Sequence, residues 1–477
     1  MTTEELYNAT SFSWVASFGK TETRDLKYYC AVYQNRIIEV YDFEGYEEEI
    51  PKRNPARYFL KGHVSREELR NHLIGLDVSS LHKGSGNPIK YTSLSTLLSL
   101  QNESSPPTVD ETVHDLLESV EFVDHVHSYI ASRGFSYSKT NIKNLYLSLR
   151  SKPFVIISGI SGTGKTKIVQ LFAESLGATE DNGQFKLTPV RPDWTDSSEL
   201  LGYVDLKGDF IEGPLTKMIK HALDNPQLPH FVLLDEMNLA RVEYYFSDVL
   251  SVMESRRRDG DGITSSNLLD EKYTGQEIKL PENLYIIGTV NMDETTHPFS
   301  KKVLDRANTI EFNEVDLNNF TYLEENDETV DPIRVANDQL KPTFISLKDI
   351  YSSHMYLVQK VSKDLDNINR KMESINAQVG YRVRDEICFY MAHNQDAGLL
   401  DEKEAFDLCL MQKILPRITG SDYRVEELLK QLYEQFTGVP FDATNVRASS
   451  DYPRSVKKIV EMLRRYQSDG FTSFWIS

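Results

Sequence analysis

The sequence has few cysteines and no long apolar run, and these absences exclude several classes of protein. Only three cysteines occur in 477 residues: Cys30, Cys388 and Cys409. Their wide spacing matches neither a disulfide framework nor a zinc site, so we expect three reduced thiols. No apolar run approaches the roughly 18 residues of a membrane span. The start, Met-Thr-Thr-Glu-Glu, lacks the basic residues that open a signal peptide. These features predict a cytoplasmic protein that does not interact with a membrane.

Basic residues are also scarce relative to acidic ones. The chain has 53 Lys and Arg against 72 Asp and Glu, a formal charge of −19, which excludes attraction of the whole surface to nucleic acid. Residues 51–90 are the exception, because eight basic residues stand there against three acidic ones, 8 − 3 = +5. The eight are Lys52, Arg53, Arg57, Lys61, Arg66, Arg70, Lys83 and Lys90. This stretch is either a local DNA-binding patch or an ordinary solvated face.

Length and patterning predict several domains. Residues 1–95 alternate like short strands at 28–33, 37–43 and 57–62, so we expect a small β-rich module. Its pattern resembles PUA-like barrel modules fused to DNA-restriction proteins. Its aromatic residues would line a pocket for a flipped base or simply pack a core: Trp14, Tyr28, Tyr33, Tyr41 and Tyr46. Residues 96–112 contain Ser-Ser-Pro-Pro and read as a linker.

The strongest motif lies at residues 159–166. The sequence there, Gly-Ile-Ser-Gly-Thr-Gly-Lys-Thr, fits G-x-x-x-x-G-K-[ST] at every fixed position and follows the apolar run 154–157. In this motif backbone N–H groups cradle phosphates, the lysine reaches the β/γ-phosphates and the hydroxyl binds Mg²⁺. The predicted nucleotide-binding residues are Gly159, Ile160, Ser161, Gly162, Thr163, Gly164, Lys165 and Thr166.

Two further apolar strands end in polar residues. The segment 230–236 ends in Asp235 and Glu236, and the segment 284–291 ends in Asn291. In a parallel sheet these ends lie at the same edge as the phosphate-binding loop. We therefore expect Asp235, with Thr166, to hold Mg²⁺, Glu236 to polarise the attacking water, and Asn291 to orient that water.

In this order and spacing, these motifs and Leu304-Asp305-Arg306 resemble the AAA+ fold, in its dynein-related branch of MoxR-type chaperones and McrB-like proteins. The segments 191–196, 380–387, 412–420 and 470–475 make the chain more similar to the McrB side. The resemblance covers about residues 125–475.

The resemblance implies an α/β fold: an AAA+ P-loop NTPase core with its N-terminal linker helices at 113–345 and a helical lid at 346–477. It implies a ring, expected to be a hexamer, with a separate McrC-type nuclease subunit. Arg306 would be an arginine finger that acts on the neighbouring subunit's nucleotide. Arg382 or Arg384 would be the lid's phosphate-sensing arginine, although an ion pair with the adjacent Asp385 or Glu386 explains either one equally well.

One departure from the McrB pattern affects the choice of nucleotide. The sensor asparagine is followed there by Thr-x-Asp, whereas here Asn291 is followed by Met-Asp-Glu. The nucleotide is thus ATP or GTP, with a slight preference for ATP. The first functional hypothesis is that the chain is the motor and DNA-recognition subunit of a restriction or phage-defence system. The alternative is a MoxR-like chaperone that remodels protein complexes, and a scaffold with a degenerate ATPase is disfavoured by the intact motifs.

Overall fold

The computed structural model describes residues 27–33, 36–48, 58–74, 76, 78, 93, 97, 116–260, 262–292, 297–313, 318, 329–443 and 450–476. The chain divides into two compact units, residues 1–108 and 109–477, and each is described by itself. Within the described residues, no helix combines the length and the apolar character needed to cross a membrane. All three cysteines are free thiols, as predicted.

The first unit is β-rich, which confirms the prediction. Strands β1 (Tyr28–Tyr33), β2 (Arg36–Glu48) and β3 (Tyr58–Val64) form an antiparallel sheet in that order, and helix α2 (Glu67–Leu73) follows. The small core of this unit contains the buried side chains of Ile37, Val40, Leu73, Leu76 and Val78. The predicted linker 96–112 falls almost wholly outside the described residues.

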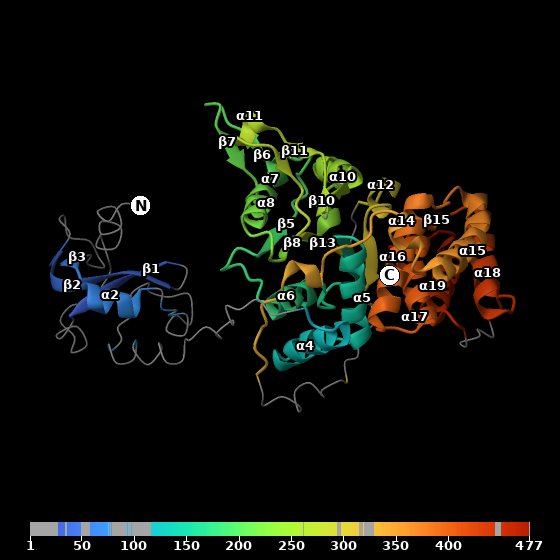
Figure 1. The fold of residues 1–477 in the computed structure, drawn as a ribbon, viewed down its shortest axis with the longest axis horizontal. Coiled ribbons are helices and arrows are strands. Elements are labelled where there is room, and N and C mark those ends of the chain that lie inside the picture. Colours follow the sequence, from blue (N-terminus) through green and yellow to red (C-terminus); the bar gives the residue numbers. More distant parts are fainter. Residues whose placement is uncertain are drawn as a thin grey trace. The chain divides into compact units, whose positions relative to one another are not determined.

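The second unit is built on a five-stranded parallel sheet with the order β14-β4-β13-β8-β5 (Figure 1). Its strands are β4 (Phe154–Gly159), β5 (Phe185–Pro189), β8 (His230–Asp235), β13 (Leu284–Asn291) and β14 (Asn308–Glu311). The central strands are near-continuous apolar runs because helices cover both faces of a parallel sheet.

Alternate residues of each strand enter two different cores, as the period of two requires. Val155 and Ile157 of β4 pack with α4 (Ser119–Ser132), α5 (Lys139–Ser151) and α6 (Lys165–Ser175). Phe154 and Ile156 pack with α8 (Pro214–Asp224), α9 (Val242–Tyr245) and α10 (Ser247–Glu254). The predicted α/β core is therefore confirmed as a three-layer structure.

Shorter elements connect the layers. They are α7 (Ser198–Leu201), β6 (Gly202–Val204), β7 (Phe210–Glu212), β9 (Arg257–Asp259), β10 (Gly262–Thr264), β11 (Asn267–Leu269), α11 (Glu271–Thr274), β12 (Ile278–Lys279), α12 (Lys301–Leu304), β15 (Thr419–Gly420) and β16 (Thr472–Ser473). Hairpin β6–β7 and α11 project together at one end of the unit (Figure 1).

The C-terminal part is helical, in agreement with its apolar periodicity. Its helices are α14 (Lys348–Tyr351), α15 (Met355–Met372), α16 (Tyr381–Ala397), α17 (Glu402–Cys409), α18 (Tyr423–Thr437) and α19 (Pro453–Asp469). These helices gather beside α5 and α12 (Figure 1). The Tyr390 hydroxyl donates to Asn144 on α5 over 2.8 Å, and Lys413 Nζ donates to the Ala307 carbonyl over 2.6 Å. The helical part therefore lies along the β14 side of the sheet.

Candidate nucleotide-binding site

The loop between β4 and α6 needs glycine at two positions. Gly162 and Gly164 adopt φ values of +81° and +85°, in the left-handed region that glycine enters without steric cost. At Gly164 an added Cβ would also collide with the hydroxyl of Tyr137. That hydroxyl donates to the Gly164 carbonyl over 2.9 Å, and burial raises the pKa of Tyr137 to about 12, so it stays a neutral donor.

Lys165 is the first residue of α6 and is only 5% exposed. Its ammonium donates to the carbonyls of Gly159 (2.9 Å) and Ile160 (2.7 Å), so the side chain turns back over the loop. Helix α6 begins directly after this loop, and a helix N-terminus attracts anions. An ammonium group and a helix N-terminus together form a site suited to phosphate.

The polar strand ends converge at this edge of the sheet. Asn291 of β13 pairs with Gly159 of β4, and β13 lies between β4 and β8. One carboxylate oxygen of Asp235 accepts hydrogen bonds from the hydroxyls of Thr166 (2.8 Å) and Thr289 (2.6 Å). Asp235 is thereby fixed beside the first turn of α6.

Glu236 is held by the neighbouring strand in a strained conformation. Its backbone N–H donates to the Thr289 hydroxyl over 3.0 Å, and the Asn291 amide donates to its carboxylate, also over 3.0 Å. Its φ is +53°, and among the described residues only Asn376 is another non-glycine residue with positive φ. Such a conformation costs about 1–2 kcal/mol and marks functional sites. The carboxylate expected to polarise water is thus positioned by the asparagine expected to orient it.

The donor set at this edge fits Mg²⁺. The Thr166 hydroxyl and the Asp235 carboxylate are oxygen donors from two different elements, 2.8 Å apart. Mg²⁺ prefers oxygen ligands and is usually bound through one or two protein groups plus water and phosphate. Both residues predicted as metal ligands are therefore close enough to share one ion.

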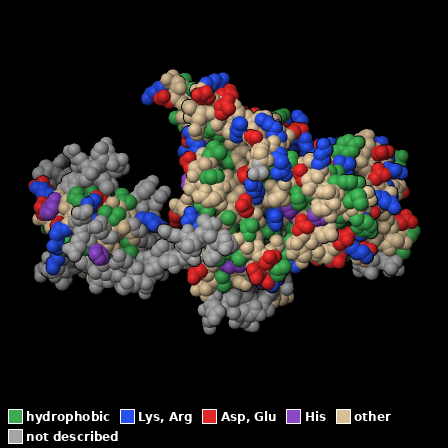
Figure 2. Space-filling model, viewed as in Figure 1, with side chains coloured by type: hydrophobic (Ala, Val, Ile, Leu, Met, Phe, Trp, Pro, Cys, Tyr) green, Lys and Arg blue, Asp and Glu red, His purple; other side chains and the backbone are tan. Residues whose placement is uncertain are grey.

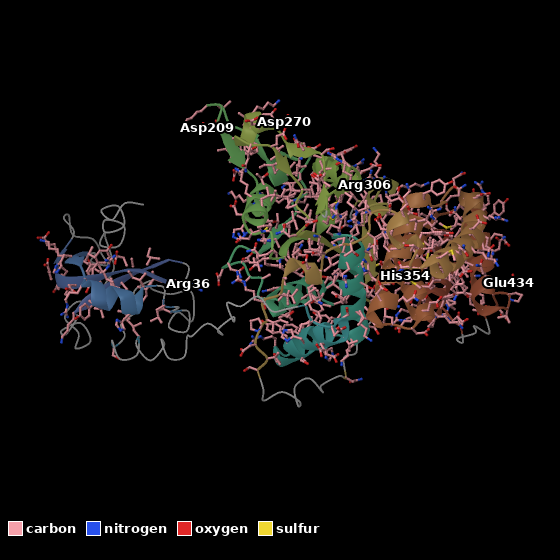
Figure 3. The ribbon with its side chains drawn as sticks, in the orientation of Figure 1. Arg36, Asp209, Asp270, Arg306, His354 and Glu434 are labelled. Carbon is pink, nitrogen blue, oxygen red and sulfur yellow. The ribbon has the colours of Figure 1, made fainter. Side chains whose placement is uncertain are left out.

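Arg306 lies at the amino ends of the strands, on the side of the sheet opposite to the phosphate-binding loop. It precedes β14, whose first residue, Asn308, pairs with Val155 near the start of β4. Its guanidinium is largely buried and donates to the carbonyls of Leu250 (3.0 Å) and Lys302 (2.8 Å). Figure 3 labels Arg306 where the core meets the C-terminal helices.

Arg382 is placed beside Arg306 by a shared carboxylate. Glu254, the last residue of α10, pairs with Arg306 through one oxygen and with Arg382 through the other. The hydrogen bond from Arg382, aided by the charge of Arg306, holds the pKa of Glu254 below its ordinary value. Arg384 instead pairs with Asp385, the local ion pair that the sequence allowed.

This placement separates both arginines from the phosphate-binding loop of their own chain. β4 runs from Phe154 to Gly159, and a strand rises about 3.3 Å per residue, so the two edges are roughly 17 Å apart. An arginine side chain cannot span that distance. In this structure Glu254 holds the Arg382 guanidinium, so a phosphate contact of Arg382 stays a prediction, as does the predicted action of Arg306 on the neighbouring subunit's nucleotide.

Sequence reasoning missed Tyr137, Thr289 and Glu254. Thr289 could have been found, because it lies two residues before Asn291 and so faces the same side of the strand. Tyr137 stands just before the N-cap Ser138 of α5, and Glu254 ends a short helix. No local pattern gives either of these two a role.

The basic stretch in the first unit is only partly described. Lys52, Arg53, Arg57, Lys83 and Lys90 lie outside the described residues. Lys61 pairs with Glu47 over 2.5 Å, and Arg70 donates two bonds of 2.7 Å to the buried Glu39. Arg66 is exposed. Two of the three described cations are therefore already paired with carboxylates.

The aromatic residues considered for a base pocket are also only partly described. Tyr41 is fully buried and stacks on Tyr29, with ring centroids 5.0 Å apart, whereas Tyr46 is 47% exposed. Trp14 lies outside the described residues, as do residues 293–296 after the sensor asparagine. Core packing accounts for Tyr41, so the pocket remains a hypothesis.

Comparison with known families agrees with this geometry. Residues 154–307 match the AAA domain of the dynein-related subfamily. This part of the chain is an AAA+ NTPase domain. The match confirms the predicted family and class of enzyme. Residues 329–471, which include all the helices from α14 to α19, match a domain of unknown function (DUF8727).

A curated relative extends the similarity to restriction proteins. The type IV methyl-directed restriction enzyme EcoKMcrB subunit of Escherichia coli (strain K12) is 24% identical over 184 residues. The match spans 38% of this chain and 38% of that protein. The AAA+ NTPase is therefore McrB-like, while the matched part covers under half of the relative's length.

Two solved structures show more distant similarity. A candidate ATPase from Cytophaga hutchinsonii has 17% identity and a TM-score of 0.35, covering 58% of this chain and 82% of that one. NtrX from Brucella abortus has 13% identity and a TM-score of 0.24, covering 46% and 42% of the two chains.

Proposed function

We propose that this chain is the NTP-hydrolysing motor and DNA-recognition subunit of an McrBC-like restriction or phage-defence system. The observation that carries the proposal is the hydrogen-bonded line from Thr166 through Asp235 and Thr289 to Glu236 and Asn291. These contacts support a metal-binding role for Thr166 and Asp235 and a water-activating role for Glu236 and Asn291, beside the phosphate-binding loop. The McrB-like AAA+ domain and the restriction relative support the wider role.

Each residue of the site has a defined task in hydrolysis. Lys165 and the α6 N-terminus bind the β/γ-phosphates. Thr166 with Asp235 would hold Mg²⁺, which would supply positive charge to neutralise the phosphates. Glu236 accepts the proton of the attacking water, and the Asn291 amide keeps the Glu236 carboxylate in position. The nucleotide is ATP or GTP.

The separation between the carboxyl and the amino ends of the strands supports a ring assembly. The loop binds nucleotide at the carboxyl ends of the strands, while Arg306 and Arg382 sit beside the amino ends. If the amino ends of the strands in one copy faced the phosphate-binding loop of the next, these arginines would reach the neighbour's nucleotide. Repetition of this head-to-tail contact closes a ring. A hexamer with a separate McrC-like nuclease is the arrangement that we propose.

Separate measurements of binding and turnover test the hydrolytic site. Lys165→Ala should lose binding of both ATP and GTP, because the ammonium that neutralises the phosphates is removed. Glu236→Gln should bind nucleotide normally and lose about 10²–10⁴ in turnover, because only water activation is lost. Asp259→Asn, an exposed change on β9, serves as the control. Normal turnover by Glu236→Gln would refute the assignment.

The ion pairs of Lys61 and Arg70 in the first unit favour one alternative function, a MoxR-like chaperone that remodels protein complexes. Lys61 and Arg70 are already neutralised by carboxylates. On the face of the second unit seen in Figure 2, basic and acidic side chains are intermixed. Duplex DNA binding by the full chain, measured against salt, decides between the two functions. Binding that weakens by a log–log slope of about −0.9 per phosphate contact supports DNA recognition, and no binding at low salt supports the chaperone.

A further inference from the structure

The chain that follows β14 packs tightly against the start of the phosphate-binding loop. The Phe312 N–H donates to the Ser158 carbonyl over 2.7 Å, and the side-chain oxygen of Asn313 accepts the Ile160 N–H over 3.0 Å. An added Cβ on Gly159 would collide with the Phe312 carbonyl and lie 3.1 Å from the Asn313 oxygen. Glycine at 159 therefore permits close approach of a second segment, in addition to any role toward phosphate.

Asn313 holds the loop because its own amide is fixed at both ends. Its side-chain nitrogen donates to the Glu311 carboxylate over 2.7 Å, while its oxygen accepts from Ile160. An amide placed between an acceptor and a donor has only one orientation that satisfies both. Residue Ile160 is thus held on both sides, because its N–H donates to Asn313 and its carbonyl accepts from Lys165 over 2.7 Å.

Glu311 is in turn held by the C-terminal helical part. The carboxylate oxygen that accepts from Asn313 also accepts from Lys458 Nζ of α19, over 2.5 Å. The side chain of Lys458 is only 3% exposed, and its ammonium lies 4.6 Å from the ring centre of the buried Phe474. Burial raises the pKa of Glu311, and Lys458 opposes this rise. A buried charge pair broken on one side is strongly unfavourable, so α19 and the end of β14 are firmly joined.

We propose that Asn313 is a positioning residue for the phosphate-binding loop, and that Glu311 and Lys458 couple it to α19. The inference rests on the proposed nucleotide-binding function and adds a route by which the helical part senses nucleotide. The bonds run from Lys458 to Glu311, from Glu311 to Asn313, and from Asn313 to the Ile160 N–H. Phosphate competes with the Gly159 and Ile160 carbonyls for Lys165. Two other side chains then still hold Ile160: the Thr163 hydroxyl donates to its carbonyl over 2.9 Å, and Asn313 accepts from its N–H.

Thermodynamic linkage makes this coupling reciprocal. If the position of α19 affects nucleotide affinity, then nucleotide must affect the stability of α19 by the same free energy. Hydrogen exchange of the α19 amides therefore reports on the coupling without any measurement of turnover. A residue that only supported the fold would change stability and leave the response to nucleotide intact.

The first experiment measures Asn313→Ala in the full chain. We expect about tenfold weaker binding of fluorescent ATP and GTP analogues, because a single hydrogen bond contributes about 0.5–1.5 kcal/mol. KM should rise and kcat should stay near the wild-type value, because Asn313 holds the loop rather than the attacking water. Unchanged affinity in a folded variant would overturn the positioning role.

The second experiment replaces the charge pair. Glu311→Gln with Lys458→Met removes both buried charges, so neither is left unpaired, and Lys457→Met on the exposed face of the same helix is the control. Nucleotide should slow α19 exchange in the wild type and in Lys457→Met but not in the double variant or in Asn313→Ala. Equal slowing in all four proteins would overturn the coupling. Should Asn313→Ala fail to fold, the double variant decides alone.

Lys165→Ala separates this inference from the proposed function. If Lys165→Ala binds the same analogues as tightly as the wild type, the nucleotide site itself is wrong. If Lys165→Ala loses binding while Asn313→Ala and the double variant behave as wild type, the site stands and only the coupling is refuted.

Discussion

Arg306 and Arg382 share Glu254, yet their removal should have different effects on stability. Arg306→Ala deletes a largely buried guanidinium that donates to two backbone carbonyls and one carboxylate. Arg382→Ala deletes one ion pair, with side chains 37% and 47% exposed. Both variants should lose turnover if the arginines serve the neighbouring subunit. Only Arg306→Ala should also lose substantial folding stability.

The contacts give the magnitudes. A carbonyl that loses its donor inside the protein costs about 1–3 kcal/mol. Loss of the buried bond to Leu250 and the part-buried bond to Lys302 therefore lowers the free energy of unfolding by about 2–6 kcal/mol. A solvent-exposed ion pair contributes only about 0–1 kcal/mol, which bounds the effect of Arg382→Ala. Urea unfolding measures both values, provided that the m-value is unchanged.

Turnover by mixed assemblies isolates the role of Arg306 between subunits. Arg306→Ala retains its phosphate-binding loop, and Lys165→Ala retains its finger, so some mixed interfaces contain one intact copy of each. Random assembly makes roughly a quarter of the interfaces competent in an equal mixture. Each variant alone should be inactive. Arg306→Ala lacks the arginine finger, which contributes about 10³–10⁵ in rate, and Lys165→Ala does not bind nucleotide.

Two results would refute this reasoning. Mixtures that remain as inactive as their components, although both variants assemble, would exclude a role across the interface. Full turnover by folded Arg306→Ala alone would show that the buried guanidinium is purely structural. Arg382→Ala is the matched comparison. Because this change hardly affects folding stability, a loss of turnover in this variant would have to come from catalysis.

Three other predictions concern single residues. Gly164→Ala should abolish nucleotide binding in calorimetry, because a Cβ collides with the Tyr137 hydroxyl at a φ of +85°, and near-normal affinity would contradict this. Thr166→Ala should raise the Mg²⁺ concentration needed for half-maximal turnover, measured by titration after chelation, because one ligand is lost. An unchanged titration would exclude Thr166 as a ligand. Burial, opposed by the Glu386 carboxylate, lowers the pKa of Lys152 to about 8 from its ordinary 10.5. The unfolded chain therefore binds more protons between these values, so stability should rise with pH across this window, and Lys152→Met should flatten that rise in urea unfolding.

Only part of the first unit could be tested against its sequence. The alternation at 28–33 and 37–43 predicted strands that the structure contains, because period-two patterning is a local property. The positive stretch left a DNA-binding patch and a solvated face equally open, and the structure pairs Arg70 with Glu39, 31 residues away. Composition counts charges and cannot show which of them are already paired.

The candidate nucleotide site at the carboxyl ends of the strands could be predicted from local sequence signals. An apolar strand that ends in Asp235-Glu236, another that ends in Asn291, and a glycine-rich loop before Lys165 must meet there, since parallel strands share one edge. Each of these signals is contained in fewer than ten consecutive residues. Backbone geometry and strand direction convert them into a site without knowledge of distant contacts.

The positions of the arginines and of the helical part depend on contacts between segments that are far apart in the sequence. Arg382 meets Glu254 across 128 residues of sequence, and Asn313 meets Ile160 across 153. The helices after residue 345 pack along β14, so their arginine lies beside Arg306 instead of at the loop of its own chain. Such contacts depend on how separately folded layers pack, and side-chain packing between distant segments has no periodicity that a single sequence displays.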